Sequence, residues 1–577
     1  MKIDDCLPPG FEPFAGSEII RHGYLPAAAA YCRKLGLVRL IDRMVPTKML
    51  LRPGLTVQTM VLDTLSGRTP LYRLESFLAE EDAELLLGEE VEAKDFNDTN
   101  LGRSLDIIFE AGPSKIITEL GIVATRTFEL NTESPSYDTT SNSVWGEYAL
   151  CEQEVSPPGP VISHGHSKDH LPHLKQFMME LLCVDRGVPI FGGTLNGNSS
   201  DKTSNNKMLS RIGKIMTSHG LGPGAFVYVA DSAMVTEDNL NAVGSNLFVT
   251  RLPATYSECG AAIAKAVDSE TWNHIGELAE YPSAKSRPHA QYKTFETSVN
   301  LHGKFYRAVV VHSTSHDKRR QKKLDKAIAA SAKTIENELK TRQNTYFCEA
   351  DALQAAKCVE KLSTRLHNVV ASVVPEEVRK RGRPPENAPP ATKVRYKLTW
   401  EMIENTGGVE RQRTLAGCFV LITNVPAEKD PMAMDARKIL QIYKGQYGVE
   451  SDFVFLKDPL IVNDLFLKKP ARIEVLGMVL IIALMIWRLM ERSMRNHVDN
   501  NEKTLPGWDG RTTKRPTTFM MTTYMKGITT IIIKGKRHLL RSPKAEQLAF
   551  LEALGVGPPA FTDPGYKCRP IIQKKNK

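Results

Sequence analysis

Apolar residues in the first part of the chain, up to about residue 125, recur at intervals of three and four. This spacing is typical of amphipathic helices and is clearest in LPAAAAYCRKLGLVRLIDRMV and LTVQTMVLDTLSG. Pro and Gly at 52–54 and the acidic stretch EEDAELLLGEEVEAKD interrupt the pattern. The sequence therefore predicts a helical N-terminal domain over residues 1–125.

The pattern changes near residue 134, where short runs of β-branched and aromatic residues are bounded by Gly, Pro, Asn or Ser. These runs predict strands, and they are SPSYDTTS, GVPIFGGTLNG, AFVYVADSAM and SNLFVTRLP. Between them, HLKQFMMELLCVD and SNNKMLSRIGKIMTSHG predict helices. Strands interleaved with helices indicate an α/β domain with a central mixed sheet, whose first part covers residues 130–253.

A different pattern interrupts this domain over residues 254–414. It contains a predicted strand (KFYRAVVVHS), a long charged helix (DKRRQKKLDKAIAASAKTIENELKTR) and a Pro-rich basic linker (VRKRGRPPENAPPATK). Sheet-like sequence resumes with AGCFVLITNV, so residues 254–414 are interpreted as an insertion and 415–500 as the second part of the domain. Residues 501–577 predict a C-terminal helical tail.

The most apolar segment is VLGMVLIIALMIW at 475–487. It is shorter than the roughly 20 residues that a membrane-spanning helix needs, so a buried core helix is expected and no membrane association. The N-terminus carries acidic residues and no apolar stretch, which argues against a signal peptide.

Composition adds a preference for polyanionic partners. The chain has 577 residues, enough for about two to four domains, and a formal net charge of +9, which favours nucleic acid. An ordinary soluble protein with a few extra lysines remains an alternative. The nine cysteines include no C-x-x-C pair, which argues against a disulfide framework and a zinc finger and favours a reducing compartment.

Two aspartates follow predicted strands. Asp138 lies in SYDTTS, and Asp231 comes directly after the apolar run FVYVA. Acids at the carboxyl ends of buried strands project from the rim of an α/β sheet, where such sheets hold their sites. A helix cap or a turn residue is the alternative interpretation of each.

A third acid lies in ILQIYKGQYGVESDFVFLKDPL. Tyr443, Gln446, Glu450 and Lys457 are spaced so that one helix would carry all four side chains along a single stripe. A stripe with a tyrosine, an amide, a carboxylate and a lysine would suit a surface that contacts phosphates and metal ions. A solvated helix face is the alternative.

These residues resemble insertion-sequence transposases of the DDE type, whose catalytic domain has the RNase H fold. In that family Tyr-x2-Arg-x3-Glu-x6-Lys marks the helix with the last acid, and here it is Tyr443, Gln446, Glu450 and Lys457, with glutamine replacing arginine. SYDTTS and VADSAM resemble the two aspartate motifs of the family. Further resemblances lie in LGLVRLID, RTPLYRLESF, GHSKDH, GGTLNGNSSD and FVTRLP, so the likeness spans most of the chain.

The resemblance implies an RNase H-like domain with an insertion before the glutamate helix, and catalysis by Asp138, Asp231 and Glu450. These carboxylates would bind two Mg²⁺ ions, with Mn²⁺ as a possible substitute, for cleavage and strand transfer at phosphodiesters. Tyr443, Gln446 and Lys457 would contact phosphates. The partners would be double-stranded DNA, as terminal inverted repeats bound through residues 1–125 and as target DNA, and a second copy in a synaptic homodimer. The expected location is the prokaryotic cytoplasm, on the nucleoid.

Other signals and other functions stay open. Arg381 and Arg383 in RKRGRPP could lie in the minor groove of A·T-rich DNA, although a plain linker is the alternative. The histidines in HGHSKDHLPH could bind zinc or copper, but no cysteine lies nearby. Two other functions would use the same fold: a hydrolysis-only nuclease, and an inactive DNA-binding protein derived from a transposase.

Overall fold

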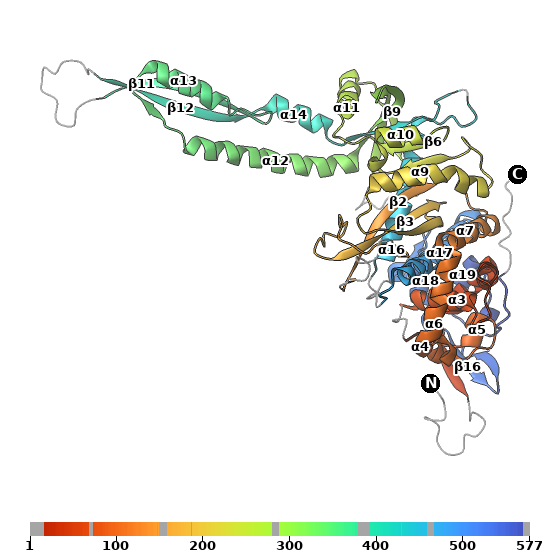
Figure 1. The fold of residues 1–577 in the computed structure, drawn as a ribbon. Helices are drawn as coiled ribbons and strands as arrows, with labels where there is room; N and C mark the ends of the chain where they lie inside the picture. Colours follow the sequence, from red (N-terminus) through yellow and green to blue (C-terminus); the bar gives the residue numbers. More distant parts are fainter. Residues whose placement is uncertain are drawn as a thin grey trace, which may run out of the picture. The chain divides into compact units, whose positions relative to one another are not determined.

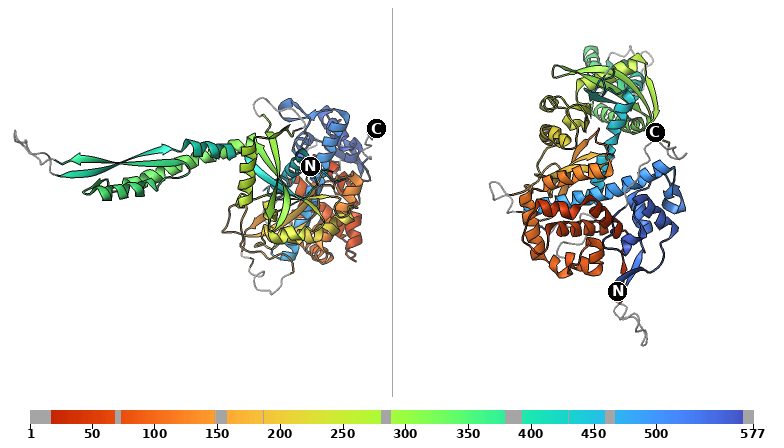
Figure 2. Two further views of the ribbon diagram at one scale, coloured as in Figure 1. Left: turned by 90° about the horizontal axis from the view of Figure 1, so that it is seen from above. Right: turned by 90° about the vertical axis from the view of Figure 1, so that its right-hand side faces the viewer.

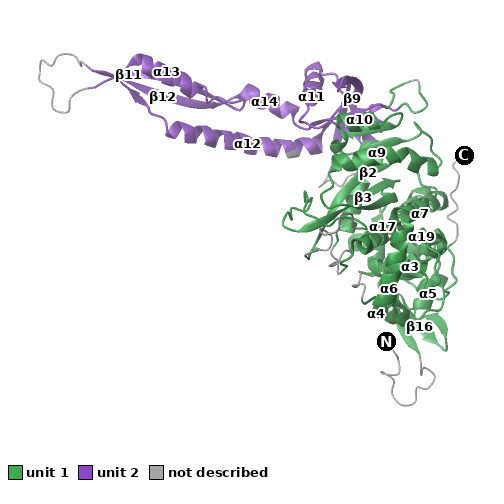
Figure 3. Cartoon of the chain, viewed as in Figure 1, with its two compact units in different colours: residues 1–250, 425–433, 442–577 green, residues 251–424, 434–441 purple. Residues whose placement is uncertain are grey.

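The computed structural model divides into two compact units, coloured separately in Figure 3. Unit 1 comprises residues 1–250, 425–433 and 442–577, and unit 2 comprises 251–424 and 434–441. The structure describes residues 17–67, 73–146, 148, 158–185, 187–279, 288–378, 393–428, 430–458 and 467–568.

The protein is of mixed α and β structure, and nine of its strands form one mixed sheet in the order β4-β3-β2-β5-β6-β13-β9-β8-β7. In unit 1 these strands are β2 (Ser136–Val144), β3 (Lys175–Val184), β4 (Val188–Leu195), β5 (Val227–Ala230) and β6 (Leu247–Arg251). β2 pairs with β3 antiparallel and with β5 parallel, and β5 pairs with β6 parallel.

Helices of the first 130 residues form a large part of unit 1. They are α1 (Leu25–Leu35), α2 (Leu37–Met44), α3 (Pro53–Ser66), α4 (Leu74–Glu80), α5 (Ala83–Leu87), α6 (Asp98–Ala111) and α7 (Pro113–Phe128). The other helices of unit 1 are α9 (Asp201–Ser218), α10 (Glu237–Ala242), α16 (Tyr447–Leu456), α17 (Pro470–Asn501), α18 (Thr518–Met525) and α19 (Ala545–Leu554).

The core of unit 1 is organised around α17. Its residues from Val475 to Trp487 are all buried, because helices and strand β4 cover it from all sides. α3, α6, α7 and α19 pack against it, so helices from both ends of the chain meet there (Figures 1 and 2). By length and composition α17 is the one candidate membrane span among the described residues, but 89% of its apolar window is buried inside the protein. The expected core helix is therefore observed.

Residues after α17 include strands as well as helices. β16 (Thr529–Ile533) pairs with β17 (Lys536–Leu539) and with β1 (Glu18–Arg21), which brings the beginning and the end of the chain into one small sheet. β14 (Leu505–Pro506) and β15 (Thr512–Thr513) form a second small sheet.

Unit 2 combines an antiparallel sheet with a long helical and β-ribbon segment. Its sheet strands are β7 (Asn273–Glu277), β8 (Gln291–Leu301), β9 (Lys304–Ser313) and β13 (Cys418–Thr423). The remaining elements are α11 (Ser257–Ser269), α12 (Thr314–Lys340), β10 (Thr345–Tyr346), α13 (Glu349–Glu360), β11 (His367–Glu377), β12 (Val394–Glu404), α14 (Thr406–Leu415) and α15 (Ala436–Gly445), the last crossing into unit 1.

The β11–β12 ribbon has a small core of its own. One face packs on Ile335 and Leu339 of α12 and on Ala356 and Val359 of α13. Arg381 and Arg383, which follow β11 and precede β12 in the sequence, lie outside the described residues.

Two predictions about elements are wrong. The segment around residues 175–184 was predicted as a helix and is strand β3, whose side chains are buried on both faces between β2 and β4. A strand buried on both faces has a continuous apolar sequence, and here the residues Met, Leu and Glu also favour helix, so periodicity alone misassigned it. The single helix predicted through Gln446 is two helices, because α15 ends at Gly445 and α16 begins at Tyr447.

Candidate functional site

Strand register places Asp138 beside Asp231. In the parallel pair of β2 and β5, Ser136 lies opposite Val229 and Tyr137 opposite Ala230, so the next residue on each side is one of these aspartates. Adjacent strands lie about 4.8 Å apart, which brings the two carboxylates close together. The sequence predicted Asp138 at the end of a strand, but the residue lies within β2. It does directly follow the last residue of β2 that pairs with β5.

Asp231 also has a structural role. It follows the last residue of β5 and caps the short 3₁₀ helix Ser232–Met234, where its Oδ1 accepts a hydrogen bond from the Ala233 amide at 3.1 Å. The carbonyl of Asp231 accepts from the Thr250 hydroxyl of β6 at 2.7 Å. Asp231 is therefore a helix cap through its Oδ1, as the alternative interpretation proposed. The same contacts fix the position of Asp231 relative to Asp138.

A third aspartate joins the pair from α9. Asp201 begins this helix after the N-cap Ser200, and its Oδ1 accepts from the Thr139 hydroxyl of β2 at 2.5 Å. Asp201 also acts electrostatically on both Asp138 and Asp231. The three acids are hereafter called the acid cluster.

Lys168 places a positive charge in the acid cluster. Its Nζ lies 3.1 Å from Asp201 Oδ1 and 3.9 Å from Asp138 Oδ1. The same ammonium donates to the Thr139 carbonyl at 2.6 Å, and the Lys168 amide donates to the Ser141 hydroxyl at 3.0 Å. The segment GHSKDH is thus held along β2 with its lysine between two acids.

Burial and mutual repulsion act on the cluster together. Burial raises the pKa of Asp138 to about 7, Lys168 opposes this, and Asp231 and Asp201 add to it. Burial, followed by repulsion from Asp201, raises the pKa of Asp231 as well. The single positive charge of Lys168 therefore does not balance the negative charge that the acid cluster would carry with all three carboxylates ionised.

The chemistry of the acid cluster fits a hard divalent cation. Carboxylate oxygens are the ligands that Mg²⁺ prefers, and a cation would relieve the repulsion that raises both pKa values. Among the described residues, no group of three or more His, Cys, Asp or Glu side chains is already gathered as a metal-ligand set. Lys168 would have to move relative to Asp138 for a metal ion to contact that carboxylate.

The predicted four-residue stripe is not a single face. Gln446 is buried at the junction of α15 and α16, whereas Glu450 is exposed. Gly445 and Gly448 flank this junction, and glycine weakens a helix interior. Tyr443 is half-buried on α15, and Lys457 follows the last residue of α16. The spacing was therefore misleading, because it assumed an uninterrupted helix.

Lys457 connects α16 to the loop of Lys168. Its Nζ lies 2.5 Å from Asp169 Oδ1, and Asp169 is the neighbour of Lys168. Glu450 stands on the same helix, which packs against β2 and β3. Glu450 is not among the principal charges acting on Asp138 or Asp231. The structure thus brings the two predicted aspartates together and leaves Glu450 nearby on α16, without a described contact to them.

A buried ion pair fixes α16 to α17. Asp452 is fully buried, and its Oδ1 accepts from the Arg488 guanidinium at 2.5 Å, while the Cys183 thiol of β3 donates to its Oδ2 at 3.4 Å. Arg488 also donates to the Ser451 hydroxyl at 2.6 Å. Asp452 and Ser451 directly follow Glu450, so these contacts hold the helix that carries it.

Sequence reasoning missed Asp201 and Lys168 as members of the site. Both lie in segments that had been noted for their resemblance, GGTLNGNSSD and GHSKDH, but neither was assigned a role in the acid cluster. The four histidines of HGHSKDHLPH are all exposed, and the described residues contain no metal-ligand group there.

Comparisons with known proteins identify one domain and no function. Residues 17–122, which include α1 to α6, match a family described as "Domain of unknown function (DUF4277)". No curated protein matches the chain.

Proposed function

We propose that the protein is a DNA transposase with an RNase H-like catalytic domain that cleaves and rejoins phosphodiester bonds with a divalent metal. The observation that carries this proposal is the adjacency of Asp138 and Asp231 across β2 and β5, in a partly buried site that is rich in acids. The order of the resembling motifs along the chain supports it independently.

In this proposal Asp138 and Asp231 hold the metal, Glu450 completes the set from α16, and Asp201 is available as a further carboxylate. Bound Mg²⁺, or Mn²⁺ in its place, would supply Lewis acidity at phosphorus and a nucleophilic oxygen. Lys457 and Lys168 carry positive charge beside the acid cluster and would contact phosphates, together with Tyr443 of α15 and Gln446 between α15 and α16. Gln446 contributes no charge, so its contact would be weaker than that of an arginine.

The proposal also assigns partners. The helices within residues 1–125 would bind the terminal inverted repeats, and a second copy of the chain would hold the other element end in a homodimer. The 3′-OH ends would then be joined to target DNA. Such a protein would act on the nucleoid of a prokaryotic cell.

The test is cleavage and joining of labelled terminal-repeat DNA by the purified full chain with Mg²⁺. Asp138→Asn, Asp231→Asn and Glu450→Gln should each lower the rate by at least about 100-fold, because each would remove a charged ligand of the metal. Asp238→Asn is the matched control, since Asp238 is an exposed aspartate on α10 a few residues beyond Asp231. Its rate should stay within about twofold of wild type.

The outcome also separates the two alternative functions. Nicking without joining would favour a hydrolysis-only nuclease, and DNA binding without either reaction would favour an inactive derivative. Full activity in Asp138→Asn or Asp231→Asn would contradict the proposal that these aspartates form the catalytic site. Mn²⁺ binding followed by electron paramagnetic resonance gives a readout that needs no DNA, and Asp138→Asn should weaken it.

A further inference from the structure

Helix α12 of unit 2 is largely exposed. Among the residues of this 27-residue helix whose side chains the structure describes, only Ile335 and Leu339 are buried, and both belong to the core beneath the β11–β12 ribbon. Its first half meets α14, where the Arg413 guanidinium pairs with Asp325 at 2.7 Å and Gln321 donates to the Arg413 carbonyl at 3.1 Å. The carboxylate of Asp325 on this side of the helix is therefore paired with Arg413, in an exposed contact.

Lysines follow a neighbouring, exposed side of the helix, about 100° around its axis from Gln321 and Asp325. Lys318, Lys322 and Lys326 are spaced by four residues and are all exposed. Residues at this spacing project from one side of a helix, about 6 Å apart along the axis. Among the described residues none of the three has an acidic partner. These three residues are hereafter called the lysine stripe.

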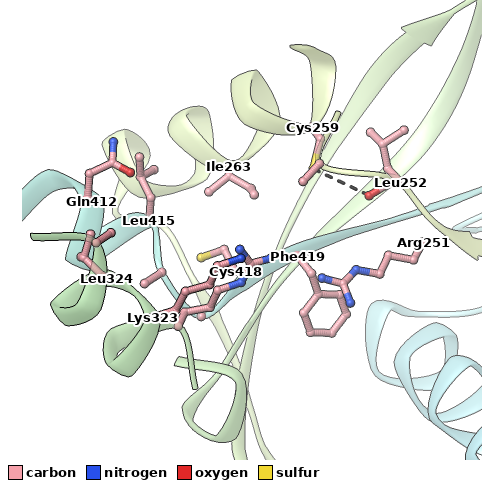
Figure 4. A pocket seen from close by; sticks show the side chains of 15 residues that line it. Arg251, Leu252, Cys259, Ile263, Lys323, Leu324, Gln412, Leu415, Cys418 and Phe419 are labelled. Carbon is pink, nitrogen blue, oxygen red and sulfur yellow. Dashed lines mark hydrogen bonds between the residues drawn. The ribbon is translucent and has the colours of Figure 1, made fainter. Parts of the chain in front are cut away.

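The flank of the same half-helix is also cationic. Arg320 and Lys323 line a cavity of about 290 Å³ in unit 2, together with Arg251. Fifteen residues line this cavity, and none of them is acidic. The Arg251 guanidinium lies 5.2 Å from the centre of the Phe419 ring, and Figure 4 shows these two side chains next to each other. Positive charge therefore continues from the lysine stripe around the helix to the cavity.

We propose that the lysine stripe is a docking surface for the sugar–phosphate backbone of double-stranded DNA. Three unpaired ammonium groups on a rigid exposed helix can neutralise successive phosphates and release their counterions. Lysine contacts phosphate as a point charge and carries no base pattern, so this surface binds DNA without regard to sequence. The inference rests on the proposed function only in that the chain acts on DNA, and it adds a surface outside the acid cluster.

The test measures binding of the full chain to a fluorescent duplex of unrelated sequence, without divalent metal, at several salt concentrations. The variant is Lys318→Gln, Lys322→Gln and Lys326→Gln combined. Glutamine keeps a helix propensity close to that of lysine, so α12 should remain folded, and circular dichroism checks this. The slope of log affinity against log salt should fall by about 2 to 3, since each phosphate contact contributes roughly 0.9.

The matched control removes the same charge elsewhere in unit 2. Lys357, Lys361 and Lys393 are also exposed, and their combined change to glutamine should leave the slope within about 0.5 of wild type. Equal slopes for the two triple variants would overturn the proposal, because net charge alone would then account for binding. Stronger lysine-dependent binding to phosphatidylserine vesicles than to duplex DNA would overturn it in favour of a membrane surface.

The two proposals fail in different ways. Wild type could bind DNA and never cleave it, while the lysine variant shows the smaller slope of log affinity against log salt. The docking surface would then stand and the transposase proposal would fall. If Asp138→Asn abolishes cleavage while both triple variants bind alike, the docking surface falls alone.

Discussion

Two long helices of this protein have opposite relations to solvent. α17 has 32 residues and is buried through its middle, whereas α12 has 27 residues and, among its described side chains, is buried at only two positions. α17 contacts helices from several parts of unit 1, and its charged Arg488 is enclosed with Asp452. α12 carries most of its charges in water. The comparison teaches that burial, and not helix length, decides what each residue contributes.

The same difference separates stability from function. In α17 a substitution lowers stability because the side chain is closely packed against its neighbours. A buried charge there needs a paired partner to offset its loss of hydration. In α12 most side chains can change with little cost, so its unpaired lysines are free to meet a partner. The following predictions, from the largest expected effect to the smallest, test this contrast.

Removing Asp452 should have the largest effect. Asp452→Ala takes away one of the two acidic partners of the buried Arg488, leaving Glu491 at 3.2 Å, and should lower the free energy of unfolding of unit 1 by about 3 kcal/mol. Asp325→Ala breaks the exposed pair with Arg413 on α12 and should cost at most about 1 kcal/mol. Hydrogen exchange resolved by peptide mass spectrometry measures both effects in their own helices. Similar losses of stability in Asp452→Ala and Asp325→Ala would contradict the proposed difference between buried and exposed ion pairs.

Truncating a core side chain should follow closely. Leu484 is fully buried in α17, and Leu484→Ala should cost about 2–5 kcal/mol through lost burial and the remaining cavity. Ile328 on α12 is half-buried, so Ile328→Ala should cost roughly half as much. Urea unfolding of the full chain gives the comparison. A smaller loss at Leu484 than at Ile328 would contradict it.

Acid should destabilise the interior of unit 1 through His22. This side chain is buried, with its Nε2 2.6 Å from the Thr530 hydroxyl of β16, and burial lowers its pKa to about 4. Because the folded pKa lies below the ordinary value of about 6.5, protonation favours unfolding. The contribution is complete above pH 6.5 and is lost as the pH falls toward 4, up to about 3 kcal/mol.

His22→Gln should remove this part of the pH dependence, since glutamine does not titrate. Thermal unfolding between pH 7 and pH 4 measures the difference from wild type. The lysine variant retains His22, so it should follow wild type over this range. An unchanged acid response in His22→Gln would show that another group dominates.

The smallest effect should come from a glycine in the exposed part of α12. Ala330 is exposed, and Ala330→Gly should cost about 1 kcal/mol through backbone entropy alone. Ala483→Gly in α17 should cost more, because Ala483 is fully buried and its methyl group packs in the core. Equal losses would indicate that packing around Ala483 relaxes freely.

Local pattern was enough for much of the fold. The β-branched runs at β2, β4, β5, β6, β9 and β13 and the apolar or charged periodicity of α9, α12 and α17 were assigned correctly from the sequence. These segments carry their signal within a few residues, through alternation, period or total hydrophobicity. The placement of Asp231 directly after β5 was also predicted, because an acid after an apolar run is a local feature.

Tertiary packing decided the rest. Residues 175–184 form a strand because β2 and β4 flank them, which no local period records. The helix before Glu450 divides at Gln446, and α17 then holds the second part through Arg488. Asp201 and Lys168 join Asp138 from distant segments, and only the folded chain brings their charges within a few ångströms of each other. The sequence by itself thus determined most of the helical, extended and apolar segments, and the position of Asp231 directly after an apolar run. The tertiary structure alone decided which charges meet, because contacts between distant segments depend on how the elements pack.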